Sequence, residues 1–224
     1  MLLQIPIIAL IASLAVILPI ISGSITVTKH LSASSKIIFV YCIIYAIFES
    51  IGWYYALHHW QNHFLHNTIS YLDILFLGIY FYQILESTFI KKIVISLIIV
   101  VLALTVWSHL GTGRDYNRLD SFALSIGNLA MIFMSLLFFY QLLNSLDIKN
   151  LLVYPNFWIV VGILIYFSGA FFTFIFAEYI AFSKDEAITS YFQIHEYFLF
   201  LQRIFLAIGL WFSKTPQQLS PSLK

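Results

Sequence analysis

Long apolar runs separated by short polar segments make up most of this chain. A bilayer core about 30 Å thick needs roughly 20 apolar residues in each crossing helix. The pattern therefore predicts an all-α membrane protein, a single bundle of seven transmembrane helices over residues 1–224, with residues 213–224 as a short tail. The expected spans lie near residues 4–22, 36–57, 67–86, 92–109, 121–142, 157–182 and 190–212.

Composition supports this interpretation and excludes two others. Hydrophobic residues make up 61% of the chain and charged residues only 9%, whereas soluble domains carry about 25% charged residues. A soluble protein is therefore excluded, and the lipid bilayer is the expected surrounding. The net charge of +1 is too small for a nucleic-acid-binding protein, which needs a basic face for the phosphates.

The basic residues predict an orientation, because cytoplasmic loops carry an excess of lysine and arginine. Three basic residues fall on one side of the expected membrane: Arg114, Arg118 and Lys184. Seven fall on the other: Lys29, Lys36, Lys91, Lys92, Lys149, Lys214 and Lys224. The count predicts an N-terminus outside and a C-terminus in the cytoplasm of a bacterial inner membrane. Tryptophans mark the two interfaces in the same arrangement: Trp53, Trp60 and Trp107 outside, Trp158 and Trp211 inside.

The first apolar run could be a membrane helix or a signal peptide. Small residues at Ser22-Gly23-Ser24 resemble a cleavage site, but no lysine or arginine precedes the run. Signal peptides normally begin with positive charge. We therefore expect a retained helix.

Two ionisable residues are expected deep in the membrane. Glu49 lies 13 residues after Lys36, and Arg203 lies 11 residues before Lys214, which places them roughly 20 Å and 16 Å from the inner boundary. Ionisable residues within spans usually pair with one another. We predict a buried ion pair between Glu49 and Arg203, serving as a clamp between helices or as a switch or ligand contact.

A second group of polar residues is expected nearer the outer side, where several helices could direct them into one outward-facing cavity. Such a cavity would suit a small polar or cationic ligand, a metal ion, or protons sensed through a histidine. The alternative is that each group faces water or lipid headgroups. The predicted ligand-binding residues are Asp73, Asn128, Glu178, Gln193, His195 and Glu196.

A histidine-rich segment follows the second span. If that helix continues outward, His59, His63 and His66 lie at i, i+4 and i+7 on one face, a spacing that can hold a transition metal. No acidic residue or cysteine joins them locally, so a solvated or interfacial loop is the alternative. Apart from such a metal ion, no cofactor is predicted.

Enzymes and transporters remain alternatives to a binding protein. A retinal protein would need a Schiff-base lysine in the last helix, and none lies between Ser190 and Ser213. A metal-dependent hydrolase or other lipid-modifying enzyme could hold a metal with four residues: Asp73, Glu178, His195 and Glu196. A small transporter subunit ranks third, because we find neither internal repeats nor helices broken by glycine or proline at mid-span.

Several aromatic motifs resemble a known group of proteins. They are Ile51-Gly52-Trp53-Tyr54, Tyr71-Leu72-Asp73, Tyr80-Phe81-Tyr82, the segment Asn156 to Gly169, and Ile208-Gly209-Leu210-Trp211. Together they resemble small bacterial seven-helix membrane proteins that accompany sensor histidine kinases, over about residues 36–214. The resemblance implies a sensory or accessory module and no particular ligand residues.

The leading hypothesis is therefore a receptor-like sensory protein. It would bind a small ligand or ion from the outer side and signal to a separate partner, a sensor histidine kinase or another signalling protein. The longest inner loops available for that contact are Thr26 to Ser35 and Asn144 to Tyr154.

Overall fold

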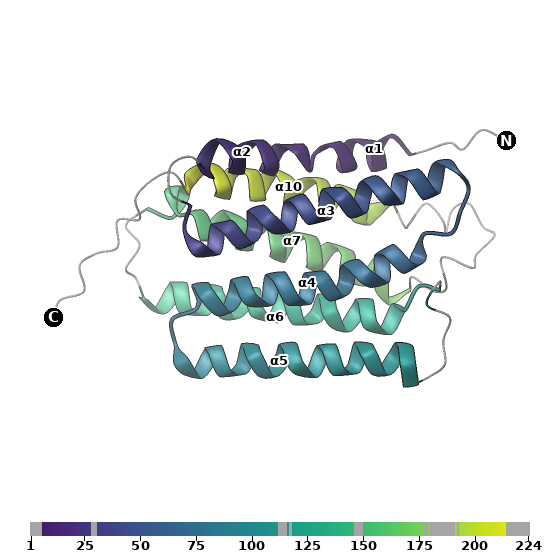
Figure 1. Cartoon of the computed structure of the whole chain (residues 1–224). Coiled ribbons are helices and arrows are strands. Elements are labelled where there is room, and N and C mark those ends of the chain that lie inside the picture. The colour runs from purple at the N-terminus through teal and green to yellow at the C-terminus, as the bar shows by residue number, and fades with distance from the viewer. Residues whose placement is uncertain are drawn as a thin grey trace.

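The structure is a computed structural model that describes residues 6–27, 31–111, 116, 118–145, 150–176, 179, 191 and 193–213. All elements in these ranges are helical (Figure 1). Seven helical stretches are long and apolar enough to cross a membrane, which confirms the prediction of a helical bundle with seven membrane-length helices. The elements are α1 (Ile7–Leu14), α2 (Ile17–Val27), α3 (Ala33–Leu57), α4 (His63–Ile84), α5 (Thr88–Val106), η1 (Trp107–Gly111), α6 (Ser121–Ser145), η2 (Leu151–Val153), α7 (Pro155–Ile175) and α10 (Ile194–Phe212).

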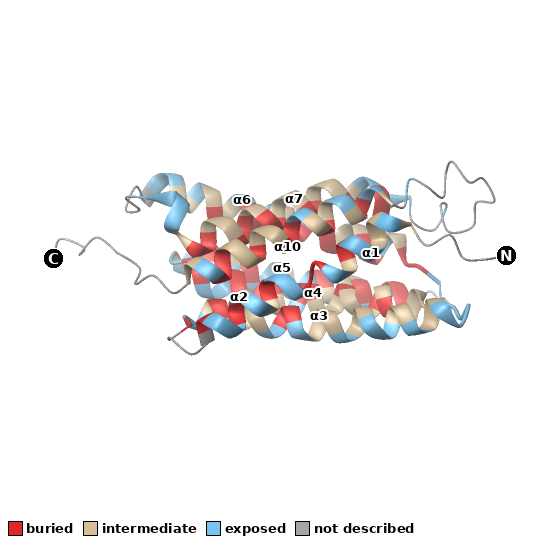
Figure 2. Cartoon of the chain, turned by 90° about the horizontal axis from the view of Figure 1, so that it is seen from above, coloured by how far each residue is buried: buried red, intermediate tan, exposed pale blue. Residues whose placement is uncertain are grey.

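The helices form two layers. One layer contains α3, α4 and α5 side by side, and the other contains α1 with α2, then α10, α7 and α6. The layers meet where α2 packs on α3 and where α6 packs on α4 and α5. Seen from above, buried residues line the space between the layers and exposed residues face outward (Figure 2). Large apolar residues such as Ile99 and Phe172 are among those that face outward, as expected of a lipid-facing surface.

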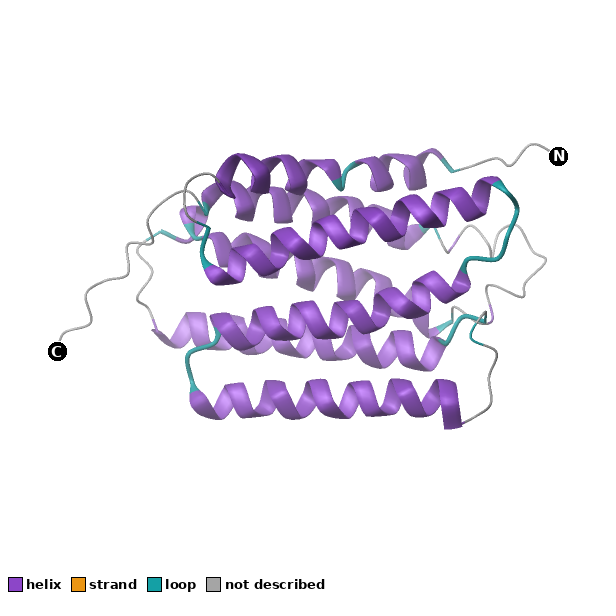
Figure 3. Ribbon diagram, in the orientation of Figure 1, coloured by secondary structure: helices purple, strands orange, loops and turns teal. Residues whose placement is uncertain are grey.

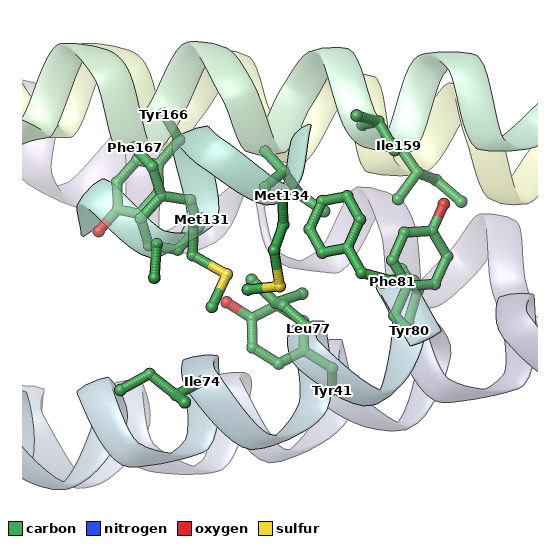
Figure 4. Packing of buried hydrophobic residues seen from close by; sticks show 14 of the residues in the cluster. Tyr41, Ile74, Leu77, Tyr80, Phe81, Met131, Met134, Ile159, Tyr166 and Phe167 are labelled. Carbon is green, nitrogen blue, oxygen red and sulfur yellow. The ribbon is translucent and has the colours of Figure 1, made fainter. Parts of the chain in front are cut away.

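The core between the layers is apolar and aromatic. Tyr80 and Phe81 from α4 are fully buried beside Met131 and Met134 from α6 and Ile159 from α7. Figure 4 shows these side chains closing the centre of the bundle. Because these apolar side chains fill the centre of the bundle, a polar cavity can lie only to one side of them.

The first span is broken, contrary to the expectation that no helix is interrupted at mid-span. It consists of α1 and α2, joined at Ala15 and Val16 (Figure 3). At the join the Val16 amide donates to the Ser13 carbonyl at 3.2 Å, instead of the Ala12 carbonyl four residues back. Pro19 has no amide hydrogen, and in a continuous helix its ring would clash with the carbonyl of the preceding turn. In the first turn of α2 it is tolerated, because amides there need no partner within the helix. The Ala12 carbonyl accepts the Ala15 amide at 3.2 Å, and because the Val16 amide turns to Ser13 it can accept a second donor from another helix.

The helices α7 and α10 pack unusually closely. A Cβ atom added at Gly209 would lie 2.5 Å from Ile159 Cγ1 and 3.0 Å from the Pro155 carbonyl oxygen. One added at Gly162 would lie 2.8 Å from Phe205 Cβ. Small residues at such contacts let helix backbones approach within a membrane. This contact fixes the helix that carries Arg203 and Glu196.

The second span ends at Leu57, as predicted, whereas α4 begins at His63, before the predicted start at residue 67. The second helix therefore does not continue through the histidine-rich segment. The sixth span was expected to reach residue 182, whereas α7 ends at Ile175 and residues 180–190 lie outside the described part of the chain.

Candidate functional site

A polar cavity of about 200 Å³ lies between the two layers. Its lining comes from α1, α3, α4, α6, α7 and α10. The lining begins halfway along the bundle, at Tyr45, Asp73 and Tyr166, and extends toward the end formed by the beginnings of α1, α4, α6 and α10 and the ends of α3 and α7. That end is on the right in Figure 1. We call this the cavity end. The opposite end carries Lys36, Lys91 and Lys92, and we call it the lysine end.

Three acidic side chains line the polar cavity. Asp73 of α4 is buried, and its Oδ1 accepts a hydrogen bond from the Tyr41 hydroxyl at 2.8 Å. Glu196 of α10 lies with its Oε1 3.3 Å from His195 Nε2. Glu49 of α3 is the third. Carboxyl groups withdrawn from water need a partner that compensates for lost hydration.

Of these three acids, Glu49 is the one whose two carboxylate oxygens both accept hydrogen bonds from described residues. Its Oε2 accepts a hydrogen bond from Arg203 Nη2 of α10, and its Oε1 accepts one from Ser13 at 2.9 Å. The same Ser13 accepts a hydrogen bond from Trp53 Nε1 at 2.8 Å. The structure thus brings Glu49 and Arg203 together, as the depth argument predicted.

Arg203 also holds the broken first span. Its Nη1 donates to the Ala12 carbonyl, which also accepts the Ala15 amide at the break between α1 and α2. Its guanidinium lies over the Tyr45 ring, 5.3 Å from the centroid, at a distance typical of a cation–π contact. One buried side chain therefore joins the first, second and seventh spans along a wall of the cavity.

Within the described part of the chain, two buried polar atoms of the cavity lining have no hydrogen-bond partner: Nδ2 of Asn128 and Oε2 of Glu196. Asn128, on α6, is only 5% exposed. In the described part of the chain, neither Asp73 nor Glu196 forms an ion pair with a lysine or arginine. An unpaired buried donor or acceptor costs about 1–3 kcal/mol, so each of these groups favours a bound polar molecule or water.

Aromatic rings form much of the remaining wall. They come from two helices, α3 and α7, so rings border the cavity on more than one side. Such rings can contact an apolar body and can also attract a cation through their faces. The aromatic lining residues are Tyr45, Phe48, Trp53, Tyr166, Phe167 and Phe174.

The predicted ligand-binding residues divide into three groups. Asp73, Asn128, His195 and Glu196 line the same cavity. Gln193 lies just before α10 and is not part of the lining. Glu178 lies outside the described residues.

The predicted metal face does not form. It required one helix through His59, His63 and His66, but His59 lies in the connection after α3, with a positive φ of 59°. His63 and His66 belong to the next helix, and His66 lines the polar cavity. Among the described residues, no group of three or more histidine, cysteine, aspartate or glutamate side chains is arranged to hold a metal ion.

His109 belongs to a separate cluster. It lies in η1, where its Nδ1 is 3.0 Å from the Tyr71 hydroxyl and 3.7 Å from Asp120 Oδ2. It is not part of the cavity lining and therefore does not face His195 across that space. The same end of the bundle is fixed by Asn67, whose Nδ2 donates to the carbonyls of Tyr116 and Arg118.

Sequence reasoning missed four residues of the site. Tyr41, Ser13 and Trp53 hold the acidic groups in place, and Tyr45 lies under Arg203. Ser13 could have been found, because a hydroxyl side chain within an apolar run indicates a polar contact inside the bundle. Trp53 was assigned to the membrane interface, because the sequence does not show that the rotation of α3 turns this side chain toward the cavity.

The seven membrane-length helices of the described chain fit a multi-pass membrane protein. Comparison of the chain with known protein families, with curated proteins and with solved structures finds no match. The polar cavity is therefore the feature that indicates a function.

Proposed function

We propose that this chain is a receptor-like sensory membrane protein that binds a small ligand in the polar cavity and acts on a separate signalling partner. The observation that carries the proposal is the convergence of Asp73, Asn128, His195 and Glu196 in one space at one end of the bundle. Ligand sites are typically concave and mostly apolar, with a few convergent polar groups.

We further propose that the cavity end faces outward and the lysine end faces the cytoplasm of a bacterial inner membrane. The lysines at the start of α3 and α5 support this orientation through the positive-inside rule. The partner, a sensor histidine kinase or another signalling protein, would then meet the lysine end. The resemblance to seven-helix proteins that accompany such kinases supports the same partner.

The network around Arg203 supplies an element that a ligand could influence. It joins three spans beside the cavity through Glu49, Ser13 and the Ala12 carbonyl. A ligand shifts a conformational equilibrium only if it binds one state better than the other. If the hydrogen bonds around Arg203 differ between two states of the bundle, a molecule that contacts Glu49 or Glu196 would bind one of those states more tightly.

The test compares three strains of the native host: one lacking the gene, one carrying Asp73→Asn and one carrying Glu86→Gln. Glu86 is exposed at the lysine end, away from the cavity. A receptor predicts that deletion and Asp73→Asn change transcription of the same genes, while Glu86→Gln does not. Unchanged transcription together with an altered lipid profile would overturn the receptor proposal in favour of a lipid-modifying enzyme.

The broken first span favours a transporter as the second candidate for the function of this protein. Many transporters build their substrate sites from interrupted helices, and here the interruption lies beside the cavity. A transporter would carry a cavity-binding compound into sealed vesicles that contain the purified protein. Binding without such flux favours the receptor.

A further inference from the structure

The acidic residues of the polar cavity outnumber its basic partners. Glu49, Asp73 and Glu196 line it, and Arg203 is already bonded to Glu49 and the Ala12 carbonyl. Among the described residues, Asp73 accepts a hydrogen bond from the Tyr41 hydroxyl, and Glu196 lies beside His195. Ionisable groups inside a membrane are costly without a partner. No lysine or arginine is among the described residues that line the cavity, so its acidic groups outnumber its permanently charged basic groups.

The second observation is independent of the acids. Asn128 is 95% buried and lines the cavity, and its Nδ2 donor has no acceptor among the described residues. A bound molecule that meets this donor needs an acceptor oxygen. A bare metal cation has none, and the described residues offer no set of three or more metal-binding side chains.

The shape of the cavity restricts the ligand further. Aromatic rings from α3 and α7 border it, and its volume of about 200 Å³ admits a molecule with a small apolar body. Aromatic faces attract ammonium groups, and the attraction is larger when the cation is removed from water. A strongly hydrated inorganic ion would leave most of this wall unused.

We infer that the polar cavity binds a small organic ammonium ion whose apolar, ring-sized body carries a hydroxyl or carbonyl oxygen. Asp73 and Glu196 accept hydrogen bonds from the ammonium group, and Asn128 donates to the oxygen. This inference rests on the proposed ligand cavity and adds the chemical class of its ligand.

The probe is tyramine, measured by calorimetric titration of the purified full chain in lipid nanodiscs. Its neutral counterpart is 4-propylphenol, in which a methyl group replaces the ammonium group. The anionic counterpart is 3-(4-hydroxyphenyl)propionate. We expect tyramine to bind at least about tenfold more tightly than 4-propylphenol, since hydrogen bonds to charged groups contribute about 1.5–3 kcal/mol.

Variants test which side chains bind the ammonium group and which bind the phenolic oxygen. Asp73→Asn and Glu196→Gln should each weaken tyramine about tenfold and leave 4-propylphenol within about twofold. Asn128→Leu should weaken both compounds several-fold, because both carry the phenolic oxygen. Glu86→Gln is the matched control and should change neither affinity. The thermal unfolding temperature of each variant without ligand separates lost binding from lost folding.

Equal binding of tyramine and 4-propylphenol, preference for the anion, or no binding of tyramine would each overturn the inference. So would tyramine binding that neither acid variant weakens in folded protein. The receptor proposal is decided separately, by the transcription of the deletion and Asp73→Asn strains. A failed ammonium test with a positive transcription result would reject the ligand class alone.

Discussion

At the scale of single residues, the polar groups of the interior form chains of contacts, so that each depends on the next. Trp53 donates to Ser13, Ser13 donates to Glu49, and Glu49 accepts from Arg203. Arg203 is 2% exposed. Removing one partner of such a buried pair is costly, while replacing both is often tolerated.

A double-mutant cycle tests this dependence. We expect Glu49→Gln to lower the free energy of unfolding by about 3 kcal/mol, because it leaves the Arg203 charge buried without its counter-ion. The double variant Glu49→Gln with Arg203→Met should lose less than the sum of the two single changes, with a coupling energy of about 1–3 kcal/mol. Denaturant unfolding in detergent measures all four proteins. Additive losses would contradict the pairing.

The pair also shows what sequence could predict at this scale. Counting residues from Lys36 and Lys214 set the depth of Glu49 and Arg203, because rise per residue is fixed in a helix. The contact of Asp73 with Tyr41 could not be found in this way. It depends on the rotation of α3 and α4, and spans that are apolar on nearly all faces give little sign of which face turns inward.

At the scale of elements, bilayer thickness makes the spans predictable and local chemistry sets their ends. Ser32 and Ser87 cap α3 and α5 by accepting hydrogen bonds from Ser35 and Ile90 amides. The break at Ala15 could not be predicted, because the hydropathy of a membrane-length run is the same for one continuous helix as for two short ones. What stabilises the break is Arg203, 191 residues away in sequence.

The close contact of α7 and α10 gives a prediction at this scale. Gly209→Ala places a methyl group 2.5 Å from Ile159 Cγ1 and 3.0 Å from the Pro155 carbonyl oxygen, so we expect a loss of about 1–3 kcal/mol. Gly52→Ala is the matched control, since its nearest atom would be Leu65 Cδ1 at 3.7 Å. That change should be neutral or stabilising by about 0.5–1 kcal/mol. Thermal unfolding of both variants checks the opposite signs.

At the scale of the whole molecule, the two ends of the bundle differ in chemistry. The cavity end contains buried acids and amides, and the lysine end begins α3 and α5 with basic residues. The sequence was sufficient to predict the number of spans and the residues that could meet at one end. It could not show that Gln193 is absent from the cavity lining, because that depends on where α10 begins.

Reporter fusions test the proposed orientation. Green fluorescent protein joined after Ser145 should fluoresce, because the lysine end is expected in the cytoplasm, while alkaline phosphatase joined after Ile175 should be active outside. Replacing Lys91 and Lys92 by Asn should reduce the difference in basic residues between the two ends of the bundle. The chain should then insert in both orientations, since basic residues near span ends set orientation. Phosphatase activity after Ser145 in the unaltered chain would reverse the assignment.

The bonds made by Arg203 have a consequence for biosynthesis. Ala12 and Glu49 enter the bilayer early in translation, whereas their common partner is made more than 150 residues later, the Glu49 separation being 154 residues. Until the helix that carries Arg203 inserts, Glu49 lacks its basic partner and the Ala12 carbonyl lacks one of its two donors, so Ser13, water, lipid headgroups or an insertase must compensate. We therefore expect chains that stop before residue 203 to be degraded faster by membrane proteases than the full chain.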